Sequence, residues 1–397
     1  MTTFFLNRLA TEPHALAFAG QSTPWPVALA DQTTDPSLDE ALRGHVAAAG
    51  RLLTPVAADL LATTGRPVDL FGFAPNPARL GAAADATASV EGVALTQLGA
   101  LLDLEHLGYS VAQAKPLAVL GHSQGVLAVH MTRAIEAAGS IEAAGKTLNE
   151  ILAVAALIGA AGTRRVRELG LNPKYGEASP MLSVKGATRE QVEALVARVN
   201  NARGPISIAV TNSDNHHVLS GYPEDLAAFA LEAEREHQHQ AKLREQKLHG
   251  GTVFNPTLEY LEVTLPFHSP LMAEAVEQTV SWAGACGFDQ DRTRALAAEV
   301  LLNHVDWNAR VKALFNAADP AKLWIVDLGP GNTLGKLIGN VVQGTGIGVV
   351  EATTLSERST LSTLESEPER TQNWKAFAPR AINTPAGAKL VTKFSKL

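Results

Sequence analysis

A chain of 397 residues that is 46% hydrophobic can bury a large core, and its length favours two subdomains. Its net charge of −7 and the absence of a Lys/Arg-rich run exclude a basic patch for nucleic acid or a membrane surface. The single cysteine, Cys286, excludes an internal disulfide framework and fits a reducing compartment, so we expect the cytoplasm. We find no signal-peptide pattern, and the apolar stretch 151–161 is too short to span a membrane.

The first 175 residues alternate predicted strands and helices. A short strand at 15–19 leads into a loop at Gly20 and Gln21, and the first helical region has Asp35 or Ser37 as its N-cap, with a break at Pro55. The other elements expected here are a loop at 75–83, a strand at 117–120 and helices at 90–107, 126–138 and 148–169. This order predicts a parallel sheet that is covered on both faces.

The segment Pro116-Leu-Ala-Val-Leu-Gly-His-Ser-Gln-Gly-Val126 places Gly-x-Ser-x-Gly between an apolar strand and a helix. This pattern is typical of a nucleophile elbow, in which the serine stands clear of the sheet. Gly121 and Gly125 let strand and helix approach each other closely. Ser123 is therefore the candidate nucleophile, and the N–H of Gln124 is a candidate oxyanion donor.

The pattern changes near residue 175. Short strands are predicted at 181–184, 206–211 and 217–220, with helices at 188–199 and 223–236. The order β-α-β-β-α is that of a ferredoxin-like split unit, inserted before the chain returns at Val263. We expect an α/β fold with an α/β-hydrolase-like core at 1–175 and 263–356 and a ferredoxin-like subdomain at 176–262.

After the insertion, helices are expected at 270–284, 307–317 and 333–342, a strand at 323–328, and either a strand or a short helix at 295–301. Residues 357–397 are polar and are expected to form a linker toward a following domain that is absent here.

A serine nucleophile needs a base, and the chain has 12 histidines. His268 lies in the apolar loop Pro266-Phe-His-Ser-Pro270, a kind of position where catalytic groups gather, although an ordinary loop histidine fits this pattern equally well. His122 is expected to point away from Ser123 and to bond locally. His237 and His239 do not share a helix face, so we expect no metal site.

These segments together resemble a known family. Gly121-His-Ser-Gln-Gly125, followed by Pro266-Phe-His-Ser-Pro-Leu-Met272, looks like the acyltransferase domains of fatty acid and polyketide synthases. The segments Phe18-Ala-Gly-Gln-Ser22, Asn303-His-Val-Asp-Trp307 and Val326-Asp-Leu-Gly-Pro-Gly-Asn-Thr-Leu334 agree with this resemblance in order and spacing. Ser179-Pro-Met-Leu-Ser183 and the tail after residue 373 resemble the acetyltransferase domain of fungal and actinobacterial type I fatty acid synthases.

The resemblance implies roles for particular residues. Ser123 would accept an acyl group and His268 would act as the base, while the N–H groups of Gln124 and Gln21 would bind the oxyanion. The backbone carbonyl of Asp306 would orient His268. The family's substrate pocket would include His122, Ile158 and Asn212, although Asn212 fits a plain strand-end turn equally well.

The resemblance also implies substrates and partners. Acetyl-CoA would be a substrate, no cofactor would be bound permanently, and the acyl group would pass to the phosphopantetheine arm of acyl carrier protein within a megasynthase. Malonyl-using relatives carry an arginine where this chain has Ile158, and no arginine occurs between Arg133 and Arg164. An unpaired carboxylate in an apolar pocket is costly, which favours acetyl groups.

Three alternatives remain open. A serine hydrolase or thioesterase shares the elbow but expects the order Ser, acid, His and no ferredoxin-like insertion. A malonyl- or palmitoyl-type transferase would differ only in acyl choice. A non-catalytic scaffold domain could keep the elbow as a relic, against which the intact Ser123 and His268 argue.

Overall fold

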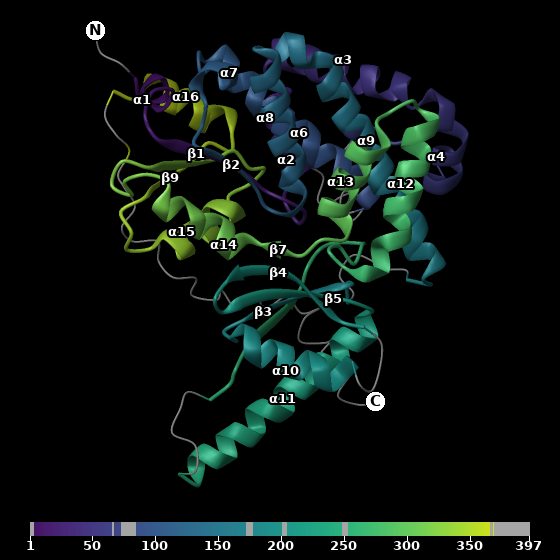
Figure 1. Ribbon diagram of the computed structural model, residues 1–397, viewed down its shortest axis with the longest axis vertical. Helices are drawn as coiled ribbons and strands as arrows, with labels where there is room; N and C mark the ends of the chain where they lie inside the picture. Colours follow the sequence, from purple (N-terminus) through teal and green to yellow (C-terminus); the bar gives the residue numbers. More distant parts are fainter. Residues whose placement is uncertain are drawn as a thin grey trace.

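The computed structural model describes residues 4–65, 67–72, 85–171, 178–200, 205–247, 253–365 and 368. The loop expected at 75–83 lies outside these residues, as does nearly all of the tail after residue 365. In Figure 1 an upper α/β region stands on a smaller lower region, from which one long helix projects.

The upper region is built on a four-stranded parallel sheet. Its strands are β1 (His14–Phe18), β2 (Ala118–Gly121), β8 (Trp324–Asp327) and β9 (Gly348–Glu351), in the order β2-β1-β8-β9. Every neighbouring pair is parallel, and β1 is buried along its whole length. Helices lie on both sides of this sheet (Figure 1), so the predicted α/β core is confirmed.

The N-terminal helices follow the sequence signals closely. The Asp35 side chain accepts the N–H groups of Ser37 and Leu38, and Pro36 occupies the first turn, so Asp35 is the N-cap. The break near Pro55 is a 3₁₀ turn at Thr54–Val56. The helices of this half are α1 (Phe5–Leu9), α2 (Trp25–Gln32), α3 (Pro36–Leu52), α4 (Ala57–Thr64), α6 (Ala86–His106), α7 (Val111–Ala114), α8 (Val126–Ala138) and α9 (Ile141–Glu168).

Helix α9 is long and apolar enough to cross a membrane by length and composition, in contrast to the shorter stretch considered from the sequence. Most of that apolar stretch is buried inside the protein, against α6, α8 and α12 (Ala273–Ala285). Among the described residues one such helix is found, or two if α3 and the bent segment Thr54–Thr64 count as one span. A buried core helix accounts for α9.

The lower region has the predicted ferredoxin-like order. The elements are β3 (Met181–Lys185), α10 (Arg189–Asn200), β4 (Ser207–Ser213), β5 (His216–Ser220), α11 (Pro223–Glu245) and β6 (Thr257–Tyr260). The strands run β6-β3-β5-β4 with antiparallel neighbours, and they cover a separate hydrophobic cluster that includes Leu219 and Phe229. The domain boundaries at 175 and 263 stay a prediction.

One strand of this second sheet comes from the returning chain. β7 (Val305–Asp306) pairs in parallel with β4, which gives the sheet five strands. Two residues are too short to leave a strand pattern in the sequence, and β7 was not predicted. It joins the inserted unit to the core immediately before α14 (Trp307–Lys312).

In the C-terminal third, residues 295–301 were expected as a strand or a short helix, and they are helical, within α13 (Gln290–Leu301). The linker does not begin at 357, because α16 (Leu355–Thr363) continues the core: the Arg358 side chain is fully buried and bonds Asp103 and the Ala352 carbonyl. A buried ion pair holds α16 against α6, and α15 (Thr333–Val342) lies where a helix was expected.

Candidate active site

The segment around Ser123 has the geometry of an elbow. β2 ends at Gly121, a 3₁₀ turn covers Ser123–Gly125, and α8 begins at Val126. A Cβ on Gly121 would lie 2.4 Å from the Val126 nitrogen, and one on Gly125 would lie 2.2 Å from the Phe18 oxygen. Ser123 has φ +53°, in the left-handed region that a non-glycine residue adopts at a cost. The two glycines thus allow the close approach of strand and helix that places Ser123 at the tight turn.

Ser123 and His268 meet across 145 residues of sequence. The Ser123 Oγ lies 2.7 Å from the His268 Nε2, and the His268 Nδ1 lies 2.7 Å from the Asn303 carbonyl oxygen. His268 also has a left-handed backbone, with φ +56°, in the loop before the short turn at Pro270–Met272. The hydrogen bond to Asn303 assigns a proton to Nδ1, so Nε2 is free to accept the Ser123 hydroxyl proton.

Asp306 was the wrong residue for orienting the imidazole. The carbonyl that accepts the His268 proton is that of Asn303, in the expected segment but three residues earlier. The Asp306 side chain instead accepts the N–H of Ala309, as the N-cap of α14. The backbone of Asp306 lies in β7, paired with Thr211 of β4, whereas Asn303 precedes that strand and its carbonyl accepts the His268 proton.

The surroundings keep His268 neutral. Burial lowers its pKa to about 3, against the opposing effect of the Asn303 hydrogen bond, and nearby His122, His304 and Arg310 lower the pKa further. His268 is 2% exposed and Ser123 is 9% exposed. At neutral pH the imidazole therefore carries no charge and is ready to take a proton from Ser123.

The loop of Gly20 and Gln21 lies directly beside the elbow. A Cβ on Gly20 would lie 2.8 Å from the Ser123 Cβ and 3.4 Å from the Gln124 nitrogen. The Gln21 side chain donates to the Gln124 Oε1, and the Gln124 Nε2 donates to the Val90 carbonyl of α6. Sequence reasoning named the N–H groups of these two glutamines and missed the bond between their side chains, because a loop-to-elbow contact leaves no local signal.

His122 turns toward the inserted sheet. Its Nε2 lies 2.8 Å from the Asn212 Oδ1 on β4, and its ring packs edge-on against Trp307 at 5.2 Å between centroids. Burial lowers the pKa of His122, which makes it a neutral donor to Asn212. Asn212 is buried in a strand rather than placed in a turn, and it joins the lower sheet to the elbow.

Two further polar residues near the elbow were not predicted. The Arg310 Nη1 donates to the Gly121 carbonyl over 2.9 Å, from α14 to the end of β2. The His304 Nδ1 donates to the Ile208 carbonyl of β4 over 2.9 Å. Both residues lie in the segment around β7, so this segment makes hydrogen bonds to the elbow and to the lower sheet.

Ile158 is fully buried in α9. A Cβ on the neighbouring Gly159 would lie 2.3 Å from the Ala86 carbonyl oxygen, and one on Gly162 would lie 2.3 Å from the Leu265 side chain. Gly162 lies one turn after Ile158, so this face of α9 packs toward the segment that leads to His268. Whether Ile158 forms the pocket wall stays a prediction.

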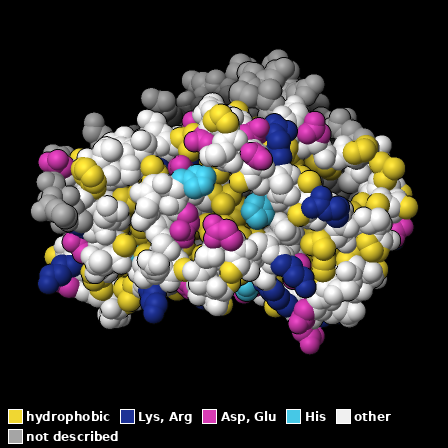
Figure 2. Space-filling view, turned by 90° about the horizontal axis from the view of Figure 1, so that it is seen from above, with side chains coloured by type: hydrophobic (Ala, Val, Ile, Leu, Met, Phe, Trp, Pro, Cys, Tyr) yellow, Lys and Arg dark blue, Asp and Glu magenta, His cyan; other side chains and the backbone are white. Residues whose placement is uncertain are grey.

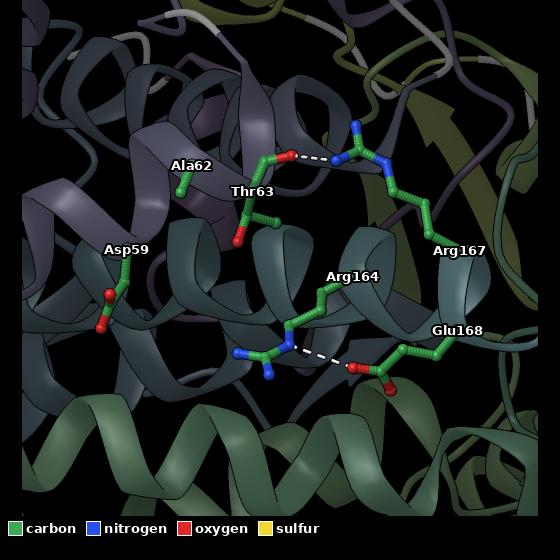
Figure 3. Close-up of a pocket in the computed structure, with 6 residues that line it drawn as sticks. All are labelled: Asp59, Ala62, Thr63, Arg164, Arg167 and Glu168. Carbon is green, nitrogen blue, oxygen red and sulfur yellow. Dashed lines mark hydrogen bonds and ion pairs between the residues drawn. The ribbon is translucent and has the colours of Figure 1, made fainter.

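A hollow of about 310 Å³ lies elsewhere, between α4 and α9 (Figure 3). Its lining residues are Asp59, Ala62, Thr63, Arg164, Arg167 and Glu168. The Arg164 Nε bonds Glu168 over 3.0 Å, and Arg167 bonds the Thr63 carbonyl. None of these residues belongs to the elbow or to the His268 loop, so the hollow is separate from the candidate site.

The surface offers no concentrated charge of one sign on the face seen in Figure 2, where acidic and basic side chains are scattered in small groups. Within the part of the chain that the structure describes, no group of three or more His, Cys, Asp or Glu side chains is arranged to hold a metal ion.

The chain is similar in sequence to known proteins. Residues 180–260 match the family model described as "Fatty acid synthase central AT domain". The chain is 27% identical over 270 residues to fatty acid synthase subunit beta of Saccharomyces cerevisiae, covering 58% of this chain and 13% of that protein. It is 25% identical over 316 residues to fatty acid synthase beta subunit aflB of Emericella nidulans, covering 70% and 14%. The chain thus spans about one seventh of these relatives.

Solved structures share the fold. MCAT from Mycobacterium tuberculosis superposes with a TM-score of 0.58 at 18% identity, over 88% of this chain and 99% of that one. A type II PKS acyl-carrier protein complex with its malonyl-transacylase gives a TM-score of 0.60 at 17% identity, over 88% and 98%. These likenesses cover the core and the inserted sheet together.

Proposed function

We propose, on the premise that this chain is related to the acyltransferase domain of fungal type I fatty acid synthases, that it transfers an acyl group between thiols through Ser123. The observation that carries the proposal is the relay from Ser123 through His268 to the Asn303 carbonyl, set in a strained elbow. The donor would be a coenzyme A thioester, and the acceptor would be the phosphopantetheine thiol of an acyl carrier protein.

The first half-reaction forms an ester on Ser123. The Ser123 Oγ attacks the thioester carbonyl while the His268 Nε2 takes its proton, and the oxyanion is held by the N–H groups of Gln124 and Gln21. The C–S bond then breaks, and His268 returns the proton to the leaving thiolate, which departs as free coenzyme A. The Asn303 carbonyl stabilises the transient imidazolium through Nδ1 without adding a buried negative charge.

The second half-reaction repeats these steps in reverse with a new thiol. His268 deprotonates the acceptor thiol, the thiolate attacks the acyl-Ser123 ester, and the Ser123 oxygen recovers the proton. The deep burial of Ser123 and His268 supports transfer over hydrolysis, because it limits the access of water to the ester.

A serine hydrolase is the second candidate, and one contact argues against it. Hydrolases of this fold pair the histidine with an Asp or Glu carboxylate, whereas His268 Nδ1 bonds a backbone carbonyl. Acyl exchange between two thiols is nearly balanced in energy, so the site need only keep water from competing for the acyl group.

We further propose that the acyl group is acetyl and that the domain primes fatty acid synthesis as one part of a larger cytoplasmic synthase. The absence of arginine between Arg133 and Arg164 supports acetyl over malonyl, because a malonyl carboxylate would enter an apolar region without a partner. One structural neighbour named above is called a malonyl-transacylase, so a comparison of acetyl-CoA with malonyl-CoA tests the proposed acyl choice.

The proposal is tested on the covalent intermediate. Incubation with acetyl-CoA should give one acetyl group per chain by intact-mass measurement, and Ser123→Ala should abolish both the adduct and transfer to acyl carrier protein, a loss of about 10⁴-fold or more. Comparing the flux to added thiol with the flux to water separates a transferase from a hydrolase. If Ser123→Ala formed the adduct to the same extent as the wild type, Ser123 would not be the nucleophile.

A further inference from the structure

We infer that the Gln124 side chain is a positioning residue that fixes the oxyanion loop of Gly20 and Gln21 against the elbow. Its Oε1 accepts the Gln21 amide, and its Nε2 donates to the Val90 carbonyl on α6. The inference rests on the proposed acyl transfer and deepens it. One residue would offer its N–H to the oxyanion and also hold the loop that carries the second N–H donor.

Burial shows that the amide is placed for its hydrogen bonds. Gln124 is 0% exposed, and both ends of its amide have a partner, in two different elements. A buried amide that lost either partner would destabilise the site, whereas leucine would fill a similar volume without any hydrogen bond. Packing alone therefore gives no reason for glutamine at this position.

The rest of the loop is fixed from other sides. The Ala19 N–H donates to the Gly329 carbonyl over 2.9 Å, and the Gln97 Nε2 donates to the Ala19 carbonyl over 2.6 Å. The Thr23 Oγ1 donates to the Gly20 carbonyl over 2.9 Å. These contacts hold the ends of the loop, and the amide of Gln124 holds its middle, at Gln21.

The tolerance for movement at this loop is small. Gly20 lies so close to Ser123 that even a Cβ would clash, so the loop and the nucleophile share one fixed spacing. Ser22, the next residue after Gln21, has φ +62°, a conformation that needs support from its surroundings. Loss of the Gln124 amide should let the Gln21 N–H drift from the place where the oxyanion forms.

The expected kinetic signature is a loss in the chemical step. The oxyanion exists only in the transition state and the tetrahedral intermediate, so a displaced donor lowers the rate of acylation while acyl-CoA binding is retained. In the full chain, Gln124→Leu and Gln21→Leu should each slow single-turnover acylation by acetyl-CoA about 10- to 100-fold. The KM for acetyl-CoA should stay within about twofold of the wild-type value.

A double variant tests whether the two side chains act as one unit. Gln21→Leu/Gln124→Leu should be no slower than the slower single variant, because the second change removes a bond that is already lost. Gln32→Leu is the matched control: Gln32 is also buried and donates to a carbonyl of α6, that of Thr96, but it belongs to α2 rather than to the loop or the elbow. It should lower the melting temperature and leave acylation unchanged.

Gln124→Glu gives a readout that a purely structural role would not move. A protonated glutamic acid can accept from Gln21 and donate to Val90, as the amide does, whereas a carboxylate cannot donate. Its acylation rate should approach that of the wild type at low pH and fall as pH rises through the pKa of the new carboxyl group. The wild type and Gln124→Leu should lack this transition.

Three results would overturn the inference: wild-type acylation by Gln124→Leu, a double variant whose loss is the product of the two single losses, or a Gln124→Glu rate without the added pH transition. If Gln124→Leu does not fold, the variants Gln21→Leu and Gln124→Glu test the positioning role instead. If the wild type forms no acyl adduct, the proposed function fails. The positioning role is then measured by the rate at which a fluorophosphonate labels Ser123, and equal labelling of wild type, Gln21→Leu and Gln124→Glu overturns it.

Discussion

The parallel core sheet and the five-stranded lower sheet contribute to the same site in different ways. β2 of the core ends in the elbow with Ser123, and the returning chain supplies His268 and the Asn303 carbonyl. The lower sheet supplies Asn212, which bonds the side chain of His122, the residue immediately before Ser123. The groups that exchange protons thus all lie on the core, and the inserted sheet bonds their sequence neighbours, His122 beside Ser123 and His304 beside Asn303.

This difference separates the residues that take part in the reaction from those that hold them in position. A change in the core relay should remove chemistry, whereas a change in the lower sheet should alter how the elbow and the pocket mouth are held. Helix α14 and β7 connect the two, through Arg310 on the Gly121 carbonyl and through β7 on β4. Graded substitutions from the core outward therefore measure how far the chemistry depends on the insertion.

Among variants that keep Ser123, the largest effect is expected at the base. His268→Ala should slow acyl transfer by about 10²- to 10⁴-fold, because a positioned general base is lost while the oxyanion donors remain. Stopped-flow acylation by acetyl-CoA measures this directly. Near-normal transfer would show that another histidine, His130 or His304, serves as the base, and the relay described for the core would be incidental.

The pH dependence sharpens the same point. With a pKa near 3 in the folded protein, His268 stays neutral from about pH 5 to 8, so wild-type acylation should not fall with protonation of this residue in that range. The unfolded chain takes up a proton on this histidine near its ordinary pKa of 6.5, so stability falls as pH drops from 6.5 toward 3. Urea unfolding of His268→Ala should show less of this acid-side loss than the wild type.

The second largest effect concerns acyl choice inside the core. An unpaired carboxylate among apolar walls should disfavour malonyl by about 2–5 kcal/mol, which corresponds to tens- to thousands-fold in kcat/KM. The measurement compares acetyl-CoA with malonyl-CoA on the wild type and on Ile158→Arg. Equal or better malonyl turnover by the wild type would refute the preference.

The Ile158→Arg variant tests whether Ile158 lies at the pocket wall. If Ile158→Arg gains no malonyl activity while the wild type prefers acetyl, Ile158 is not at the pocket wall and the preference has another source. Ile158 is fully buried, so a melting curve must accompany the kinetics. Leu157→Met, on the same helix and also fully buried, serves as a control for changes in α9 packing.

A smaller effect is expected from the lower sheet. Asn212→Ala leaves the buried His122 Nε2 without its acceptor, which should cost about 1–3 kcal/mol of stability and reduce acyl transfer no more than about tenfold. Asn215→Ala, on the nearby exposed turn, is a suitable control. A loss as large as that of His268→Ala would show that the inserted sheet takes part in the chemistry and would remove the contrast between the two sheets.

The parts predicted from sequence are those with a strong local pattern. The elbow, the helix at 126–138 and the N-cap at Asp35 depend on neighbours within a few residues, and they lie where they were expected. The order of elements also predicted the α/β core and the ferredoxin-like sheet, because alternating strand and helix patterns restrict the topology.

The parts that were missed depend on contacts between distant segments. α16 looks polar, yet its Arg358 is buried because Asp103 on α6 and the Ala352 carbonyl satisfy it. The Gln21–Gln124 bond joins residues 103 positions apart, and β7 exists only because β4 lies beside it. The orienting carbonyl is a backbone group, so the identity of residue 303 could not reveal it.

The smallest effect on activity is expected at Asp306, which lies where the two sheets meet. Because its carboxylate caps α14 rather than orienting His268, Asp306→Ala should cost about 1 kcal/mol of stability and change acylation less than about threefold. Asp306→Asn, which keeps an N-cap acceptor, should restore most of that stability. Thermal unfolding and single-turnover acylation of the two variants distinguish the roles. A large loss of acylation by Asp306→Ala with unchanged stability would mean that its carboxylate acts on His268, and that the connection between the sheets is part of the catalytic relay.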